Sequence, residues 1–294
     1  YQNNDWVWVP VRLRKTDIDY INKYWGACKD KSAPALEKIH NKYYLRFSFT
    51  EIVTLNDTPI TEQIICAVDL GINTDAVCSI MKADGTILAR KFIDFTSDKD
   101  RMIHAMNRTR RKQSKYGPKS ARGLWAYVKR LNEDRAKKIS AAIVEFASQH
   151  SVDAIVMEHL DFKGCKKRGS KAQRLSMWNH GIIREKVEQK AHLLGIRIAT
   201  ICAWKTSALA FDGSGSVTRD DNNHALATFT TGKQYNCDLS ASYNIGARYF
   251  IRELLKSLPA TEESHVKAKV PDVGRRTSCT LSTLRTLVKE ISVA

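Results

Sequence analysis

Three acidic residues stand at the ends of apolar segments of the sequence. Asp69 closes the apolar run 64–68, Glu158 closes the run 152–157, and Asp238 lies in the first turn of a helical pattern. An ionised carboxylate at the end of a core strand is costly unless it is paired or bound to a cation. Carboxylate oxygens are hard ligands that suit Mg²⁺ or Mn²⁺. Taken alone, Asp69 could equally cap the turn before Gly71.

The periodicity of the apolar residues predicts the elements that carry these acids. In chain order we expect strands at 64–69, 75–81 and 86–95, a broken helix at 97–150, a strand at 152–160, a helix at 175–194, a strand at 196–201 and a helix at 237–256. This order is that of an α/β, ribonuclease-H-like mixed sheet with flanking helices. In such a fold the three carboxylates converge and hold two metal ions about 4 Å apart, one activating water and one stabilising the leaving oxygen.

The charge of the chain points to a polyanionic partner. The 294 residues carry 48 Lys and Arg against 31 Asp and Glu, a formal charge of +17, which favours nucleic acid. The residues expected to contact phosphates are Arg108, Arg110, Arg111, Lys112, Lys115, Lys119 and Arg122 in the broken helix, and Lys166, Lys167 and Arg168 in a glycine-containing loop. Clustered cations favour a phosphate contact over the alternative, a solvated face. A membrane is not expected as a partner, because no apolar run reaches 18 residues and no clear basic amphipathic helix with an aromatic face is found.

The seven cysteines are dispersed and form no C-x-x-C pair. This pattern indicates a reducing compartment, the cytoplasm, and gives no zinc signature.

Composition and pattern divide the chain into five parts. We expect a β-rich module at 1–62, a first part of the catalytic domain at 63–204 with a basic helical arm at 100–135, a loop-like insert at 205–236 and the final helix at 237–256. Residues 257–294 are expected to be a polar, mobile tail, with a short amphipathic candidate at Leu281–Ile291. The first residue is Tyr1 and not Met, so we expect that the sequence begins within a longer polypeptide.

Three segments of the sequence resemble the RuvC motifs of TnpB, the transposon-encoded RNA-guided DNA nucleases ancestral to the small type V CRISPR effectors. They are Val68-Asp69-Leu70-Gly71-Ile72-Asn73, Val156-Met157-Glu158-His159-Leu160 and Cys237-Asp238-Leu239-Ser240-Ala241-Ser242-Tyr243-Asn244-Ile245. The resemblance runs from about residue 64 to residue 255, and Trp204-Lys205-Thr206-Ser207 resembles the approach to the zinc-binding insert of that family. Residues 1–62 would then be the end of a wedge (oligonucleotide-binding) domain.

The resemblance implies a Mg²⁺-dependent DNA endonuclease with a single RuvC site, in which Asp69, Glu158 and Asp238 are the metal ligands. A guide RNA would select double-stranded target DNA, which opens into a heteroduplex and a displaced strand. The protein would act in the cytoplasm of a prokaryotic cell, on the nucleoid when bound.

The chain departs from the family in the insert, where two C-x-x-C pairs are usual and none occurs. Without thiolates or histidines at those spacings, we expect no structural zinc and a metal-free loop over the site. Arg219, within this insert, is a candidate contact to the scissile strand, although a surface arginine facing solvent is favoured.

Two other function classes stay open. One is an RNA-guided DNA-binding protein that does not cut, such as a repressor or targeting subunit, a class that usually lacks one or more of the acids. The other is a resolvase or transposase on the same fold that acts without RNA. The basic arm and the wedge-like start argue against the second class.

Overall fold

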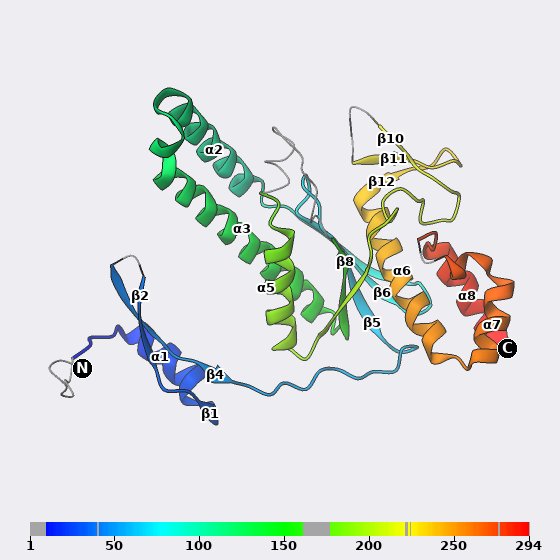
Figure 1. Cartoon of the computed structure of the whole chain (residues 1–294). Coiled ribbons are helices and arrows are strands. Elements are labelled where there is room, and N and C mark those ends of the chain that lie inside the picture. The colour runs from blue at the N-terminus through cyan, green and yellow to red at the C-terminus, as the bar shows by residue number, and fades with distance from the viewer. Residues whose placement is uncertain are drawn as a thin grey trace. The chain divides into compact units, whose positions relative to one another are not determined.

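The apolar runs of the sequence pair into a five-stranded sheet in a computed structural model of the chain (Figure 1). The structure describes residues 10–39, 41–160, 177–220, 223, 225–275 and 277–293. The strands of the sheet are β5 (Ile64–Asp69), β6 (Ala76–Lys82), β7 (Ile87–Ile93), β8 (Ala154–His159) and β9 (Arg197–Cys202). Their order is β7-β6-β5-β8-β9, with antiparallel pairing from β5 to β7 and parallel pairing of β5 with β8 and of β8 with β9. This is the predicted ribonuclease-H-like fold.

The burial of each strand explains its sequence pattern. β5 and β6 are buried over nearly their whole length, which requires the continuous apolar runs of central strands. β7 lies at the edge of the sheet and alternates between exposed and half-buried residues.

Helices cover both faces of the sheet. They are α2 (Thr96–Tyr116), α3 (Arg122–Gln149), α5 (His180–His192), α6 (Cys237–Ser257), α7 (Ala260–Lys269) and α8 (Leu281–Val293), with short 3₁₀ turns η2 (Pro118–Ala121) and η3 (Pro271–Gly274). Cys66 and Val68 of β5 belong to a core shared with α3 and α5. Ile65 and Ala67, on the opposite face, belong to a core shared with α6 and α8.

Helices α2 and α3 form the predicted broken helix (Figure 1). The break follows Tyr116, where Gly117 adopts a φ of 82° and Pro118 begins η2. Only glycine adopts that backbone conformation readily, so the sequence fixes where the chain turns back.

The C-terminal segment differs from the expected mobile tail. Residues 260–293 form α7, η3 and α8, and Leu281, Leu284 and Leu287 are at most 1% exposed. These leucines lie in the core beside α6. The prediction failed because the polar residues of this segment outnumber the apolar ones, although the apolar ones recur at helical spacing on one face.

The insert at 205–236 is also more ordered than the expected loop. It contains a three-stranded antiparallel sheet of β10 (Thr218–Arg219), β11 (Leu226–Thr228) and β12 (Gln234–Asn236). Phe211 and Phe229 pack edge to face at 5.6 Å between ring centroids, and Tyr235 lies against both rings. Apolar contacts of this kind hold the described part of the insert together.

The described residues as far as Thr54 form a unit separate from the one that begins at Leu55, so the boundary falls earlier than the expected residue 62. Its elements are α1 (Lys15–Ile21), the π-helical turn η1 (Asn22–Gly26), β1 (Asp30–Lys31), β2 (Ala35–Ile39), β3 (Lys42–Arg46) and β4 (Phe49–Thr50). The described residues from 10 to 54 include none that is buried. None of the described helices combines the length and the apolarity that crossing a membrane requires.

Candidate nuclease site

Strands β5 and β8 carry two of the three predicted acids to the same end of the sheet. The strands are parallel neighbours, with Val68 opposite Met157. Asp69 and Glu158 are the next residues along each strand, so they lie beside each other where the strands end. Both carboxylates are half-buried.

The third acid, Asp238, comes from the first turn of α6. The side chain of Asn236 caps this helix by accepting the N–H of Leu239 at 2.8 Å. A negative charge in the first turn is favoured by the helix dipole. The helix lies close against β5, since a Cβ on Gly246 would be 3.2 Å from the Cβ of Ala67.

The three carboxylates interact electrostatically. Burial raises the pKa of Asp69 well above its usual range, and the charges of Glu158 and Asp238 raise it further. Such interactions weaken with distance and with solvent screening, so their presence places the three acids in one cluster. In the sequence, Asp69 and Asp238 are 169 positions apart (238 minus 69).

Two threonines interact with two of the acids, Thr206 with Glu158 and Thr74 with Asp238. Burial raises the pKa of Glu158, and the hydrogen bond from Thr206 opposes this rise. Burial also raises the pKa of Asp238, opposed by the charge of Arg219 and by a hydrogen bond with Thr74. A single threonine has no sequence signature, so these contacts were not predicted. The only sequence feature that includes Thr206 is the segment 204–207, which resembles the approach to the insert.

Gly71 has a steric reason to be glycine. A Cβ at this position would lie 2.5 Å from the backbone oxygen of Thr74, which is closer than two such atoms can approach. A larger residue would therefore displace Thr74 and with it the hydroxyl that bonds Asp238. The glycine that follows Asp69 keeps the turn tight enough to bring Thr74 to the site.

A buried ion cluster connects the helical arm to the turn that follows Asp69. The side chain of Asp75 is fully buried and pairs with Arg135 of α3 and with Lys99 of α2, the latter at 3.2 Å. Its other oxygen accepts the N–H of Phe95 at 2.8 Å. Lys99 also donates to the backbone oxygen of Asn73. Sequence reasoning missed this cluster because its members come from three separate elements.

Arg219 is a surface arginine, as was favoured from the sequence, and its charge also acts on two of the acids. It is solvent-exposed on β10, and its Nη2 donates to the Oγ of Ser207 at 2.8 Å. Its positive charge lowers the pKa values of Asp69 and Asp238. A guanidinium that is exposed and also close to half-buried carboxylates can contact a phosphate that enters the site.

The donor chemistry of the acid cluster suits divalent cations. Three carboxylates with raised pKa values are stabilised in their ionised forms by a bound cation. Within the described residues, however, no group of three His, Cys, Asp or Glu side chains already has the spacing of a metal site. The fit therefore rests on the identity, burial and mutual electrostatics of Asp69, Glu158 and Asp238.

The other predicted contact residues divide into two groups. Those of the helical arm are all exposed, namely Arg108, Arg110, Arg111, Lys112, Lys115, Lys119 and Arg122. From Arg101 to Asn132 the chain has ten Lys and Arg and no Asp or Glu. Lys166, Lys167 and Arg168 lie outside the described residues.

No protein-family model and no curated protein sequence matches the chain. Among solved structures, it is similar to a chain of a Cas12f1–sgRNA–target DNA complex, with a TM-score of 0.48 and 17% identity over 71% of this chain and 54% of that one. A CRISPR–Cas12f ternary complex gives a TM-score of 0.45 and 17% identity over 79% of this chain and 48% of that one. T. thermophilus RuvC in complex with a Holliday junction substrate gives a TM-score of 0.36 and 11% identity over 66% of this chain and 96% of that one.

The chain thus spans about half the length of the type V effector chains to which it is similar.

Proposed function

We propose that the chain is the nuclease portion of an RNA-guided, Mg²⁺-dependent DNA endonuclease with a single RuvC site. The observation that carries this proposal is the convergence of Asp69, Glu158 and Asp238 from two parallel strands and a helix N-terminus. Three mutually repelling, half-buried carboxylates reduce stability in the absence of a cation, so a function in binding cations explains their presence.

Asp69, Glu158 and Asp238 would hold two Mg²⁺ or Mn²⁺ ions. Bound there, the ions would supply an activated water and stabilisation of the leaving oxygen. In the protein itself, the hydroxyls of Thr206 and Thr74 each favour the ionised form of one acid, Glu158 and Asp238 respectively, against the effect of burial. Arg219 would bind the phosphate of the scissile strand and reduce its repulsion from the acids.

The guide RNA and the DNA target follow from the resemblance of the motifs and from the charge of the chain. The exposed cations of α2, η2 and α3 would contact the backbone of the guide–target heteroduplex. The displaced strand would enter the acid cluster as a single strand. The residues of the insert around Arg219 would lie along its path.

The test is cleavage by the full protein purified from cells together with its flanking DNA. We expect a discrete bound RNA, and Mg²⁺-dependent cuts in a DNA that matches it. Asp69→Ala and Glu158→Ala should each abolish cutting and leave RNA-dependent DNA binding largely intact, because each removes a cation ligand and no phosphate contact. Glu188→Ala, which removes an exposed acid of α5, is the matched control and should cut normally.

Each alternative class gives a different result. Bound RNA with target binding and no cuts would indicate a guided binding protein. Cuts without any bound RNA would indicate a resolvase or transposase. Loss of DNA binding in Asp69→Ala would mean that Asp69 has a structural role.

A further inference from the structure

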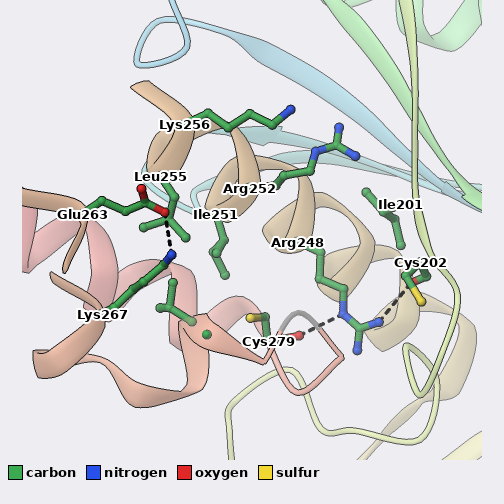
Figure 2. Close-up of a pocket in the computed structure, with 12 residues that line it drawn as sticks. Ile201, Cys202, Arg248, Ile251, Arg252, Leu255, Lys256, Glu263, Lys267 and Cys279 are labelled. Atoms are coloured by element: carbon green, nitrogen blue, oxygen red, sulfur yellow. Dashed lines mark hydrogen bonds and ion pairs between the residues drawn. The ribbon is translucent and has the colours of Figure 1, made fainter. Parts of the chain in front are cut away.

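Arg248 of α6 is a buried guanidinium, 5% exposed, whose hydrogen bonds go to backbone carbonyls. Its positive charge also lowers the pKa of Glu158. Its Nη1 donates to the carbonyl oxygens of Cys202 at 3.1 Å and Trp204 at 2.7 Å. Its Nη2 donates to Thr277 at 2.8 Å, and its Nε donates to Cys279 at 3.1 Å. Figure 2 shows the guanidinium between Cys202 and Cys279. Arg248 also lines a cavity of about 240 Å³. Four directed bonds from one rigid group fix the position of both segments.

Asn244, one helical turn before Arg248, binds the continuation of the first segment. Its Nδ2 donates to the carbonyl oxygens of Thr206 at 3.0 Å and Leu209 at 2.9 Å. Its side chain is fully buried, and its Oδ1 accepts the N–H of Leu281 at 3.3 Å. The helix that carries Asp238 therefore holds the backbone of residues 202–209 on both sides of Thr206.

The Thr206 side chain lies at the centre of this held segment. It is 3% exposed, and its hydroxyl donates to Oε1 of Glu158. The carbonyl of Ala203, at 3.0 Å, is a second possible acceptor. A hydroxyl has one hydrogen, and an ionised carboxylate is the stronger acceptor. A carboxylate that is held at one oxygen keeps its second oxygen in a defined direction.

We infer that Thr206 is a positioning residue that orients Glu158 toward a divalent cation, and that Arg248 and Asn244 hold Thr206 in place for this task. The inference rests on the proposed function. A purely structural hydroxyl would satisfy its own burial and leave cation binding unaffected. Hydrogen bonds to the ligands of a metal commonly change affinity or activity by about 10- to 100-fold.

The test compares Thr206→Val with Thr206→Ser in the RNA-bound protein. Valine keeps the shape of threonine and lacks the donor, whereas serine keeps the donor. We expect Thr206→Val to weaken Mn²⁺ binding, measured by electron paramagnetic resonance of free Mn²⁺, and to slow single-turnover cleavage, each by about 10- to 100-fold. Affinity for target DNA without divalent cations should stay within about twofold, and Thr206→Ser should remain near the unmodified protein.

Thr109→Val is the matched control. Thr109 is fully buried and donates only to the carbonyl of Ala105 in its own helix, at 2.8 Å. It should change neither measurement. Mn²⁺ binding by Thr206→Val that equals that of the unmodified protein would overturn the inference, as would equal losses in the valine and serine variants. If the unmodified protein binds Mn²⁺ but cuts nothing, the proposed function fails, and the comparison of Mn²⁺ affinities still decides the inference.

Arg248→Lys tests the second step. A lysine ammonium has three donors and cannot reproduce four fixed bonds. We expect faster hydrogen exchange at the backbone amides of residues 203–209 and weaker Mn²⁺ binding, with exchange in β5 unchanged. Unchanged exchange at 203–209 would overturn the role of Arg248 in holding Thr206.

Discussion

At the scale of single residues, the acid cluster lowers the stability of the folded chain and provides ligands for cations. Asp69 is affected most, because burial and two neighbouring negative charges all oppose its ionisation. The residues around it limit this cost: Gly71 permits the turn that brings Thr74 to Asp238, and Arg219 supplies a positive charge. A cation bound among the acids would remove most of the remaining penalty.

Asp69→Asn should therefore raise the stability of the cation-free protein. The unfolded pKa of an aspartate is about 3.9, and the folded pKa of Asp69 is higher. Between the two values the folded state binds more protons, so the stability of the unmodified protein falls as the pH rises. The asparagine side chain of the variant has no such titration. In EDTA at pH 8 we expect the melting temperature of the variant to exceed that of the unmodified protein by about 2 °C or more.

The pH dependence distinguishes this effect from a general gain in packing. The difference in melting temperature should shrink as the pH is lowered from 8 to 5 and should be reversed by excess Mg²⁺, which binds the unmodified site. Asp57→Asn, at an exposed position, should show no such trend. A variant that is less stable than the unmodified protein at pH 8 would contradict the origin assigned to the raised pKa.

At the scale of elements, α6 connects the site to the rest of the unit. It carries Asp238 in its first turn and packs closely on β5 through Gly246. Through Asn244 and Arg248 it also binds the segment 202–209, where the insert begins, and the segment that leads into α8. The position of Asp238 thus depends in part on contacts with α8, which carries none of the three acids.

Leu284→Ala in α8 should lower the free energy of unfolding by about 2–5 kcal/mol, because a fully buried leucine leaves a cavity when it is shortened. The measurement is urea unfolding followed by circular dichroism. Thr286→Ala, at an exposed position of the same helix, should change stability by less than about 0.5 kcal/mol. Equal and small effects of both changes would mean that residues 281–293 are a mobile tail after all.

At the scale of the whole molecule, positive charge is concentrated in the helical arm. The helical arm from Arg101 to Asn132 has ten Lys and Arg, while the net charge of the chain is +17. Asp75 pairs with Lys99 and Arg135, which flank this stretch on α2 and α3, and so ties the base of the arm to the turn after Asp69. A polyanion bound along the arm would therefore contact helices that are fixed to this turn.

Reversing two charges of the arm tests this placement. Arg111→Glu combined with Lys115→Glu should weaken nucleic-acid binding and make it less dependent on salt, with a loss of about 0.9 in the slope of log K against log salt for each phosphate contact removed from duplex DNA. Fluorescence anisotropy over a series of salt concentrations would measure this slope. Lys82→Glu with Lys289→Glu makes the same charge change at exposed positions outside the arm. Equal effects of the two pairs would show that net charge alone governs binding.

The sequence by itself determined the order of the core elements and the candidate acids. Continuous apolar runs specify buried strands, Gly117-Pro118 specifies the break in the arm, and the acids stand at the points where apolar segments end or a helix begins. These signals are local, so they can be read without knowing which segments meet.

Only the tertiary structure decided the contacts between distant segments. Thr206 reaches Glu158 across 48 positions, and Arg248 reaches the carbonyls of residues 202–204 and 277–279. The tertiary structure also showed that α7 and α8 pack in the core beside α6, and that the described part of the insert is a small sheet with aromatic contacts. The physical reason is that hydroxyl, amide and guanidinium groups take whatever partner the fold brings within about 3 Å, and no local pattern specifies that partner.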